Sequence, residues 1–182
     1  MNDLLSVASR RLIFECVTAH PGAHLRDVAR RCALPLGTTL YHLDTLADAS
    51  FVHARRDGRY KRYFTASAMG RRDKDVISVL RHETPRRIVQ VLLDSEPLTQ
   101  RELCDALGVS RSTLSFHAAS LVTQGIIERI EVRPERKYSV LERDIVVDLF
   151  TRFGSSLEPT MAVPVSMPTL IAPVNAEVEV HA

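Results

Sequence analysis

The sequence has few cysteines, no long apolar run and almost no net charge, and each shortage excludes a class of protein. Its three cysteines, Cys16, Cys32 and Cys104, have no paired spacing, which argues against a disulfide framework and for a reducing compartment. No segment approaches the roughly 18 consecutive apolar residues that span a bilayer, and the N-terminus lacks the apolar core of a signal peptide. We therefore expect a cytoplasmic protein without a membrane partner.

Motifs for catalysis are also missing. The sequence contains no Walker motif, dinucleotide fingerprint, paired-carboxylate site or nucleophile elbow. Cys16, His20 and His24 are spaced by four residues, as on a metal-binding helix face, but Pro21 and Gly22 interrupt that helix. We therefore predict no enzymatic activity, no cofactor and no metal site.

The charge is unevenly distributed along the 182 residues, although the formal net charge is only +2. Residues 1–70 carry ten Lys/Arg against six Asp/Glu, residues 71–141 carry twelve against ten, and residues 142–182 carry two against six. Five of the positive charges fall between positions 55 and 62, around Asp57-Gly58. A local positive cluster of this kind is where a polyanion would bind.

An internal repeat organises the chain. A shift of 75 positions aligns two halves without a gap, and the same order of elements recurs in each. The shift superposes these identical residues: Arg11 and Arg86, Ile13 and Ile88, Arg26 and Arg101, Thr38 and Thr113, His42 and His117, Leu46 and Leu121, Tyr63 and Tyr138.

Each half reads as three helices followed by a β-hairpin. In the first half we expect helices over about 9–20, 25–32 and 36–49, and strands over 51–56 and 59–64 that meet at Asp57-Gly58 in a type I′ turn. In the second half, Thr84, Thr99 and Ser110 are expected helix caps, and strands are expected over 126–132 and 137–141.

These patterns define a domain plan. We predict one domain over 1–70, a linker with a short helix over 71–83, a second domain over 84–141, an amphipathic helix over 142–153 and a disordered tail over 154–182. The apolar side of the 142–153 helix either packs on its own chain or forms a homodimer seam. The fold class is mainly α with small β-hairpin wings (α+β).

Helix, short helix, tight turn, helix and basic hairpin are the parts of a winged helix-turn-helix. The segments "PGAHLRDVARRCALPLGTTLYHLDTLADASFVHARRDGRYKRYF" and "PLTQRELCDALGVSRSTLSFHAASLVTQGIIERIEVRPERKYSVL" resemble the ArsR/MarR-like superfamily, and more narrowly the archaeal-type tandem winged helix-turn-helix transcriptional regulators. The resemblance covers about residues 10–153. It implies two tandem winged helix-turn-helix domains that bind double-stranded DNA, with "LYHLDTL" and "SRSTLSFHAASL" as recognition helices and "RRDGRYKRYF" as a wing.

The resemblance also implies which residues contact DNA. A recognition helix fits the major groove, where side chains reach base edges, and the wings present cations to phosphates. In the second helix the outward residues are Arg111, Ser112, Ser115 and Phe116, and the matching residues of the first are Leu36, Gly37, Leu40 and Tyr41, which include few hydrogen-bonding groups. The full set of expected DNA-binding residues is Thr38, Tyr41, Arg55, Arg56, Arg59, Lys61, Arg62, Arg111, Ser112, Thr113, Ser115, Phe116, Arg133, Arg136 and Lys137.

We expect a repressor in which the second unit discriminates between sequences and the first supplies phosphate affinity. One alternative is an architectural protein that coats DNA without sequence preference. Another is a protein-interaction module that docks on a partner such as the transcription machinery through an exposed patch of Leu36, Leu40 and Tyr41. The basic hairpin also has a plainer interpretation, because charges on an edge strand oppose aggregation.

Overall fold

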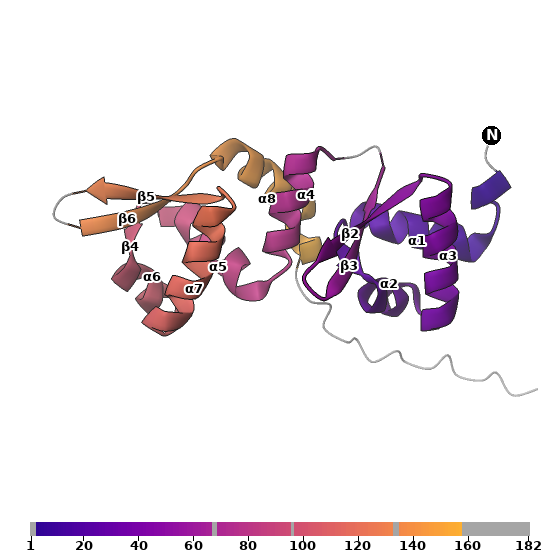
Figure 1. Ribbon diagram of the computed structural model, residues 1–182, viewed down its shortest axis with the longest axis horizontal. Coiled ribbons are helices and arrows are strands. Elements are labelled where there is room, and N and C mark those ends of the chain that lie inside the picture. The colour runs from indigo at the N-terminus through magenta and orange to yellow at the C-terminus, as the bar shows by residue number, and fades with distance from the viewer. Residues whose placement is uncertain (1–2, 67–68, 96, 133–134, 158–182) are drawn as a thin grey trace, which may run out of the picture.

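The computed structural model describes residues 3–66, 69–95, 97–132 and 135–157. It contains two units of similar plan with two helices between them (Figure 1). The first unit contains η1 (Asp3–Leu5), α1 (Ala8–Ala19), β1 (Ala23–His24), α2 (Leu25–Cys32), α3 (Leu36–Asp48), β2 (Val52–Asp57) and β3 (Tyr60–Thr65). The second contains α5 (Glu83–Ser95), β4 (Leu98–Thr99), α6 (Gln100–Leu107), α7 (Arg111–Thr123), β5 (Ile127–Val132) and β6 (Glu135–Val140). The helices between the units are α4 (Arg71–Leu80) and α8 (Arg143–Leu157). The fold class predicted from the sequence, tandem winged helix-turn-helix of α+β type, is confirmed.

Polar caps fix the helix starts of the second unit. The Thr99 hydroxyl accepts a hydrogen bond from the Glu102 backbone N–H at 3.2 Å, and the Glu102 carboxylate in turn accepts from the Thr99 N–H at 2.7 Å. Such a reciprocal box satisfies two N–H groups that have no partner inside the helix. Ser110 caps α7 in the same way, through the Thr113 N–H at 3.1 Å. Only Thr84 differs from prediction, because α5 already begins at Glu83.

The first unit starts its helices differently. The His24 ring accepts the Asp27 backbone N–H through Nδ1 at 3.1 Å, so an imidazole occupies the place that a hydroxyl takes in the second unit. Helix α3 follows Pro35 without a side-chain cap. Its first turn therefore leaves backbone N–H groups without a protein side-chain acceptor.

Each hairpin belongs to a three-stranded antiparallel sheet. The strand orders are β1-β3-β2 and β4-β6-β5, with Ala23 opposite Tyr63 in the first and Leu98 opposite Tyr138 in the second. The two-residue strands β1 and β4 were not predicted, because two residues are too few to show an alternating pattern. They attach the hairpin to the start of the second helix of each unit.

The turn of the first hairpin differs from the predicted type I′ turn. Asp57 pairs with Tyr60, so the two turn residues are Gly58 and Arg59 instead of Asp57 and Gly58. Gly58 has φ +55°, and Arg59 is not among the residues with positive φ. A positive φ at the first turn position alone is the sign pattern of a type II′ turn, in which glycine takes that position.

Helix α4 spans Arg71–Leu80 and therefore takes up most of the predicted linker over 71–83, which was expected to contain only a short helix. Its residues Val76, Ile77 and Leu80 are fully buried, as their spacing predicted. Phe64 from the first unit joins the same core cluster as these residues and the second unit. A Cβ placed on Gly22 would lie 3.1 Å from Ile77 Cγ2, which shows how closely the first unit approaches α4.

Helix α8 extends four residues beyond its predicted end. Residues 154–157 were assigned to the tail, yet they complete the helix, and Ser156 and Leu157 are buried. Burial of Leu157 against the body of the protein gives the last turn a reason to form that the sequence pattern did not contain. The rest of the predicted tail, residues 158–182, lies outside the described residues.

Two hydrophobic cores result, of unequal extent. The smaller is formed within the first unit around Ile13, Leu43 and Leu46. The larger joins the second unit to α4, to Phe64 and to Val146 and Leu149 of α8. Within the described residues, no helix is both long and apolar enough to span a bilayer.

Candidate nucleic-acid interface

Helix α7 presents a mixed polar and aromatic surface. Leu114, Ala118 and Leu121 point into the core, and the opposite side of the helix is exposed. Phe116 is 73% exposed, and Arg111, Ser112, Thr113 and Ser115 are also on the surface. The Ser115 hydroxyl accepts a hydrogen bond from Gln100 Nε2 at 2.7 Å, so α6 orients one of the expected base-reading groups.

Helix α3 occupies the equivalent place in the first unit with a more apolar surface. Leu36 is 48% exposed, Leu40 is 39% exposed and Tyr41 is 64% exposed. Thr38 is exposed beside them, whereas Thr39 is buried and bonds the Pro35 carbonyl. The structure therefore brings the predicted α3 residues to the surface, but few of them are hydrogen-bonding groups.

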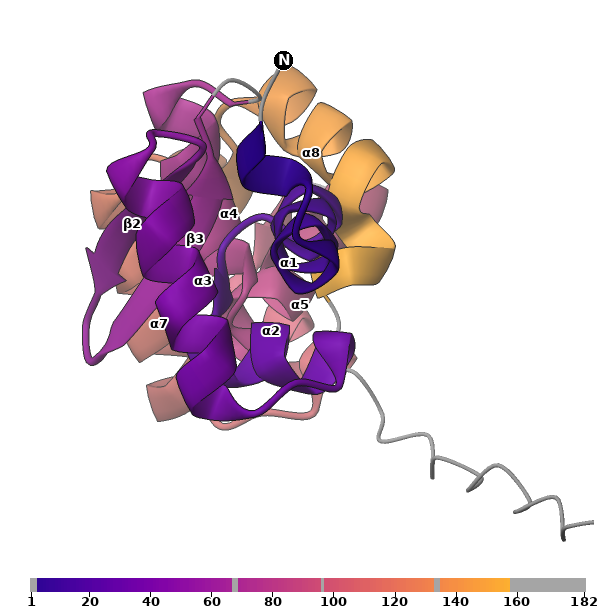
Figure 2. The same cartoon turned by 90° about the vertical axis from the view of Figure 1, so that its right-hand side faces the viewer.

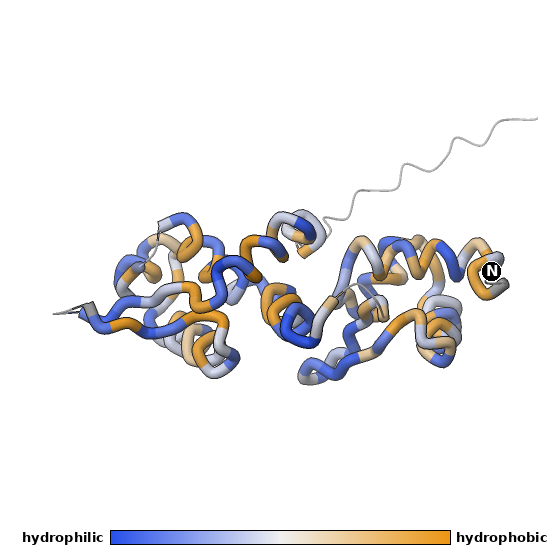
Figure 3. Tube along the Cα trace, turned by 90° about the horizontal axis from the view of Figure 1, so that it is seen from above, coloured by the Kyte–Doolittle hydropathy of each residue, from blue (hydrophilic) through white to orange (hydrophobic). Residues whose placement is uncertain are grey.

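The basic hairpin β2–β3 is divided between surface and interior. Arg56 and Arg59 are exposed, and the Arg59 guanidinium lies 5.4 Å from the centre of the Tyr60 ring. Lys61 is half exposed and lies 3.5 Å from Asp44 of α3. Arg55 forms an ion pair with Asp75 of α4. Seen from above, the tip of this hairpin is hydrophilic (Figure 3).

Arg62 does not belong to the exposed cationic surface, contrary to the sequence-based expectation. It is 4% exposed, and its guanidinium contacts Asp57 at 2.5 Å, the Gly22 carbonyl at 3.0 Å and His82 Nε2 at 3.2 Å. Its side chain points to the face of β3 where the Gly22 carbonyl and His82 lie. Alternation alone did not reveal that this side of β3 is covered by the loop before α5.

The second hairpin is less basic. The Arg136 side chain is 79% exposed and lies 3.7 Å from Glu131 on the neighbouring strand. Lys137 is half-buried and pairs with Thr99 across the sheet. Arg133, the remaining predicted contact, lies outside the described residues.

One face of the molecule carries α3, the β2–β3 hairpin and α7. Figure 1 looks onto this face, and Figure 2, turned by 90°, places all three on the same side, with α8 opposite. The structure thus places α3, α7 and the more basic hairpin on a common face. Sequence could predict these elements individually but could not predict that they share a face.

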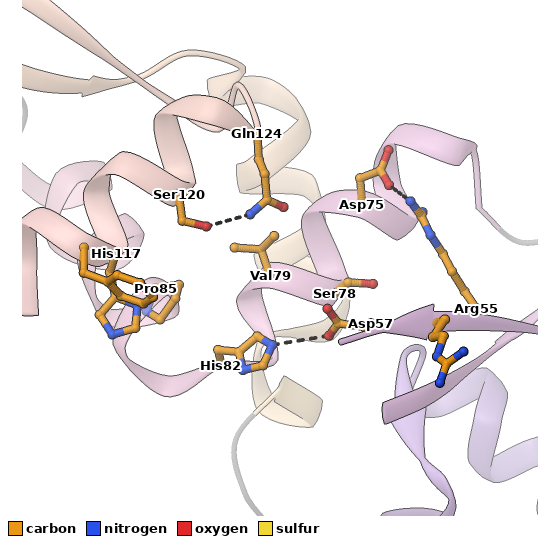
Figure 4. Close-up of a pocket in the computed structure, with 12 residues that line it drawn as sticks. Arg55, Asp57, Asp75, Ser78, Val79, His82, Pro85, His117, Ser120 and Gln124 are labelled. Atoms are coloured by element: carbon orange, nitrogen blue, oxygen red, sulfur yellow. Dashed lines mark hydrogen bonds and ion pairs between the residues drawn. The ribbon is translucent and has the colours of Figure 1, made fainter. Parts of the chain in front are cut away.

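A groove separates the β2–β3 hairpin from α7, with a volume of about 320 Å³ (Figure 4). Sequence analysis did not single out its floor, where His82 lies 3.3 Å from Asp57. Burial lowers the pKa of His117, and the nearby His82 lowers it further. His42, its counterpart in the first unit, is buried, and burial followed by the charge of Arg10 lowers its pKa as well. Both rings are therefore mainly neutral at pH 7, which fits packing better than phosphate binding.

Comparison with known proteins gives two matches to family models. Residues 7–77 match a model described as an N-terminal HTH domain, and residues 84–137 match the MarR family. An uncharacterized HTH-type transcriptional regulator of Methanocaldococcus jannaschii is 28% identical over 123 residues, which are 68% of this chain and 31% of that protein. The chain thus spans about a third of the length of this curated relative.

Solved structures show weaker similarity. A conserved hypothetical protein from Chlorobium tepidum matches with a TM-score of 0.31 and 15% identity, over 78% of this chain and 97% of that one. ScpB from Mycobacterium tuberculosis matches with a TM-score of 0.30 and 14% identity, over 83% of this chain and 97% of that one.

Proposed function

We propose that this chain is a tandem winged helix-turn-helix transcriptional regulator with a MarR-like second unit, and that it represses transcription by binding double-stranded DNA across one face. The observation that carries the proposal is the common face formed by α3, the β2–β3 hairpin and α7. Two recognition helices on one side can enter successive major-groove segments, about 34 Å apart on B-DNA. A protein bound in this way occludes the DNA between and around those segments.

Direct base reading is assigned to α7. Arg111 can bond the O6 and N7 acceptors of a guanine, Ser112 and Ser115 can bond bases or phosphates, and exposed Phe116 can lie against a thymine methyl group. The exposure of these four side chains supports the assignment. Thr113 lies beside them and shares a hydroxyl contact with Ser110 at 2.9 Å.

Phosphate binding is assigned chiefly to the β2–β3 hairpin. Arg56, Arg59 and Lys61 are the exposed cations there, and each phosphate that they neutralise releases counterions. Arg55 contributes less because Asp75 already compensates its charge, and Arg62 is excluded by burial. On the second hairpin, Arg136 adds a further cation, although Glu131 partly offsets it.

The unit of action is proposed to be one chain. The apolar side chains of α8 contact the core of their own chain: Val146 and Leu149 are fully buried, and Ile145, Phe150 and Phe153 pack against it. This favours the own-chain alternative over a homodimer through 142–153. Two linked units already present two recognition helices.

Selection of bound fragments from a pool of random duplexes, followed by nuclease footprinting, tests the proposal. We expect enrichment of a defined sequence and a protected region long enough to cover two successive major-groove segments. An unenriched pool with strong binding would instead support the architectural alternative. Absence of any gel retardation at low salt would contradict DNA binding altogether.

A second candidate function is docking on a protein partner such as the transcription machinery. The exposed Leu36, Leu40 and Tyr41 on α3 favour it. A helix that reads bases in the major groove does so mainly through hydrogen-bonding side chains, and this patch offers few of them. Replacing Leu40 with Ser separates the two functions. Unchanged DNA affinity together with loss of a polymerase complex would support docking, whereas altered DNA affinity would place α3 on the duplex.

A further inference from the structure

A second cavity, of about 310 Å³, is lined by residues that are not assigned to the proposed DNA contacts. It is bordered by β1 and α2 of the first unit, by the start of α5, and by Leu157 at the end of α8. The cavity therefore lies where the first unit, the second unit and the last helix meet. Its volume is at the lower end of the range for small-molecule sites.

The cavity wall is rich in cations. Its described lining includes four arginines and two histidines but only two acidic residues: Arg30, Arg62, Arg81, Arg86, His24 and His82 against Asp27 and Glu83. Asp27 is shared, because it lies 2.6 Å from Arg30, 3.3 Å from Arg31 and 3.9 Å from Arg81. One carboxylate thus faces three guanidinium groups.

Two of these arginines are buried and bonded mainly to neutral acceptors. Arg81 donates to the Pro21 carbonyl at 2.8 and 3.0 Å and to the Ser156 carbonyl at 2.7 Å. Arg86, which is 6% exposed, donates to the Leu157 carbonyl at 2.8 Å. Carbonyl oxygens satisfy the N–H groups without neutralising the charge, and an uncompensated buried charge is costly.

The electrostatics agree with this geometry. Burial lowers the pKa of Arg81 to about 10, and the charges of Arg31, Arg62 and Arg86 act in the same direction while Asp27 opposes them. The lowered pKa of Arg81 reflects first the cost of burying its charged guanidinium and then repulsion by the neighbouring arginines. An anion in the cavity would relieve that repulsion.

We propose that this cavity binds a small ligand through a phosphate group carrying two negative charges. Guanidinium groups present paired N–H donors that match phosphate oxygens. Arg30 lines the cavity from the first unit, and Arg86 lines it from the second. The ligand is either inorganic phosphate or a phosphate monoester, since both carry the same recognised group. Because such a ligand contacts both units, it restrains the separation of α3 and α7.

The proposal is tested with the full chain in the absence of DNA. Inorganic phosphate and adenosine monophosphate are each titrated at constant ionic strength, with sodium chloride as the reference anion, and the melting temperature and calorimetric heat are recorded. We expect a rise in Tm and a saturable heat with at least one of the two phosphates, because a ligand that binds only the folded state stabilises it. Binding of both identifies the phosphate group alone as sufficient, and binding of only the monoester identifies an ester ligand.

Two variants with opposite expected effects on phosphate affinity test whether the binding occurs in this cavity. Arg30→Gln removes a half-exposed cation and should weaken phosphate binding about tenfold, and Glu83→Gln removes an anion and should tighten it by a similar factor. Arg101→Gln, at an 82% exposed position of the second unit, is the matched control and should leave the affinity unchanged. Equal small effects of phosphate and chloride, or equal affinities in all variants, would overturn the proposal.

Competition with duplex DNA distinguishes a small-ligand site from a site that contacts the DNA backbone. If a short duplex displaces the phosphate in direct competition, the cavity contacts the DNA backbone and the small-ligand proposal is wrong. Simultaneous binding supports it. Since the phosphate titrations contain no DNA, their failure leaves the proposed repressor function intact, and a failure to bind DNA leaves the phosphate result intact.

Discussion

Several positions 75 apart in the two units hold the same places in the fold with different side-chain chemistry. The second helix of each unit is capped by a side chain, which is the His24 ring in the first unit and the Thr99 hydroxyl in the second. The first exposed residue of the third helix is Leu36 in one unit and Arg111 in the other. The backbone plan therefore depends on where apolar residues and caps fall, while the outward surface is free to diverge.

The two units also use their cations differently. In the first unit, Arg62 is buried and Arg55 is paired with α4, so part of its basic hairpin stabilises the junction between units. In the second unit, Arg111 and Arg136 remain on the surface. A count of positive charges thus overstates what the first hairpin can offer to DNA.

The largest expected effect concerns how the first unit approaches α4. Gly22→Ala should lower the free energy of unfolding by about 3 kcal/mol, because Gly22 has φ +76° and an added Cβ would meet Ile77 and Phe64. Gly108→Ala is the matched variant in the second unit, since Gly108 has φ +67° but open space around it. It should cost only about 1 kcal/mol. Urea unfolding measures the free energy of unfolding of both variants. Equal decreases would contradict the close packing of Gly22 against Ile77 of α4.

The next effect concerns base reading. Arg111→Ala should reduce discrimination between the selected sequence and a variant of its guanine by about 1–3 kcal/mol, because a bidentate contact is lost. Leu36→Ala, at the equivalent position of the first unit, should leave discrimination nearly unchanged. Competition binding with matched and altered duplexes measures the ratio. A larger loss in the Leu36 variant would reverse the assignment of the two helices.

Contacts of the β2–β3 hairpin with DNA phosphates should show a smaller effect, which is the same for every DNA sequence. The double variant Arg59→Ala/Lys61→Ala should weaken binding to all duplexes alike and reduce the slope of log K against log salt by about 2, which corresponds to two lost phosphate contacts. Arg152→Ala is a control for overall charge, because Arg152 is exposed beside Asp148 on α8, opposite the proposed DNA face. Loss of sequence preference in the double variant, with no change in slope, would contradict the division of labour.

The smallest effect concerns acid stability. Burial by itself would raise the pKa of Asp27, but the hydrogen bond from Arg30 and the charges of Arg31 and Arg81 lower it below the ordinary carboxyl value. This contribution to stability is therefore complete above the ordinary carboxyl pKa and is lost as the pH falls through the lowered folded-state pKa. Unfolding midpoints measured between about pH 6 and pH 2 should fall less steeply in Asp27→Asn than in the unaltered protein.

Glu102 provides the comparison in the second unit. The hydrogen bonds from the Thr99 backbone and hydroxyl lower the pKa of Glu102, but the carboxylate is exposed. Glu102→Gln should therefore change the acid dependence less than Asp27→Asn. A greater change with Glu102→Gln would show that the capping box outweighs the buried arginine contacts.

Sequence was sufficient for what depends on neighbours along the chain. Thr99 and Ser110 were predicted as caps because a hydroxyl before an apolar periodic segment satisfies the first free N–H groups, and both form those bonds. The inward positions of α4 followed from helical spacing in the same way. The type of hairpin turn did not follow, because the register that makes Gly58 and Arg59 the turn residues is set by pairing across the sheet.

Sequence was insufficient for what depends on packing between segments that are distant along the chain. Nothing local distinguishes Arg62 from Arg59, yet one is buried against Gly22 and His82 and the other is exposed. Cys16 and Cys32 have no paired spacing in the sequence, yet their thiols lie close enough across α1 and α2 for each to shift the pKa of the other. The phosphate cavity combines residues from three separate segments, and only their folding together makes it visible.

The contacts of Arg81 have a consequence for proteolysis. Its guanidinium donates hydrogen bonds to the carbonyls of Pro21 and Ser156, so a single side chain joins the turn after α1 to the last turn of α8. Phe64, which belongs to the larger core, is a further contact between the first unit and the second apart from the peptide connection near residue 70. We therefore expect that connection to be unnecessary for the two units to stay together. A protease that nicked the chain there would leave two fragments that stay together until they are denatured.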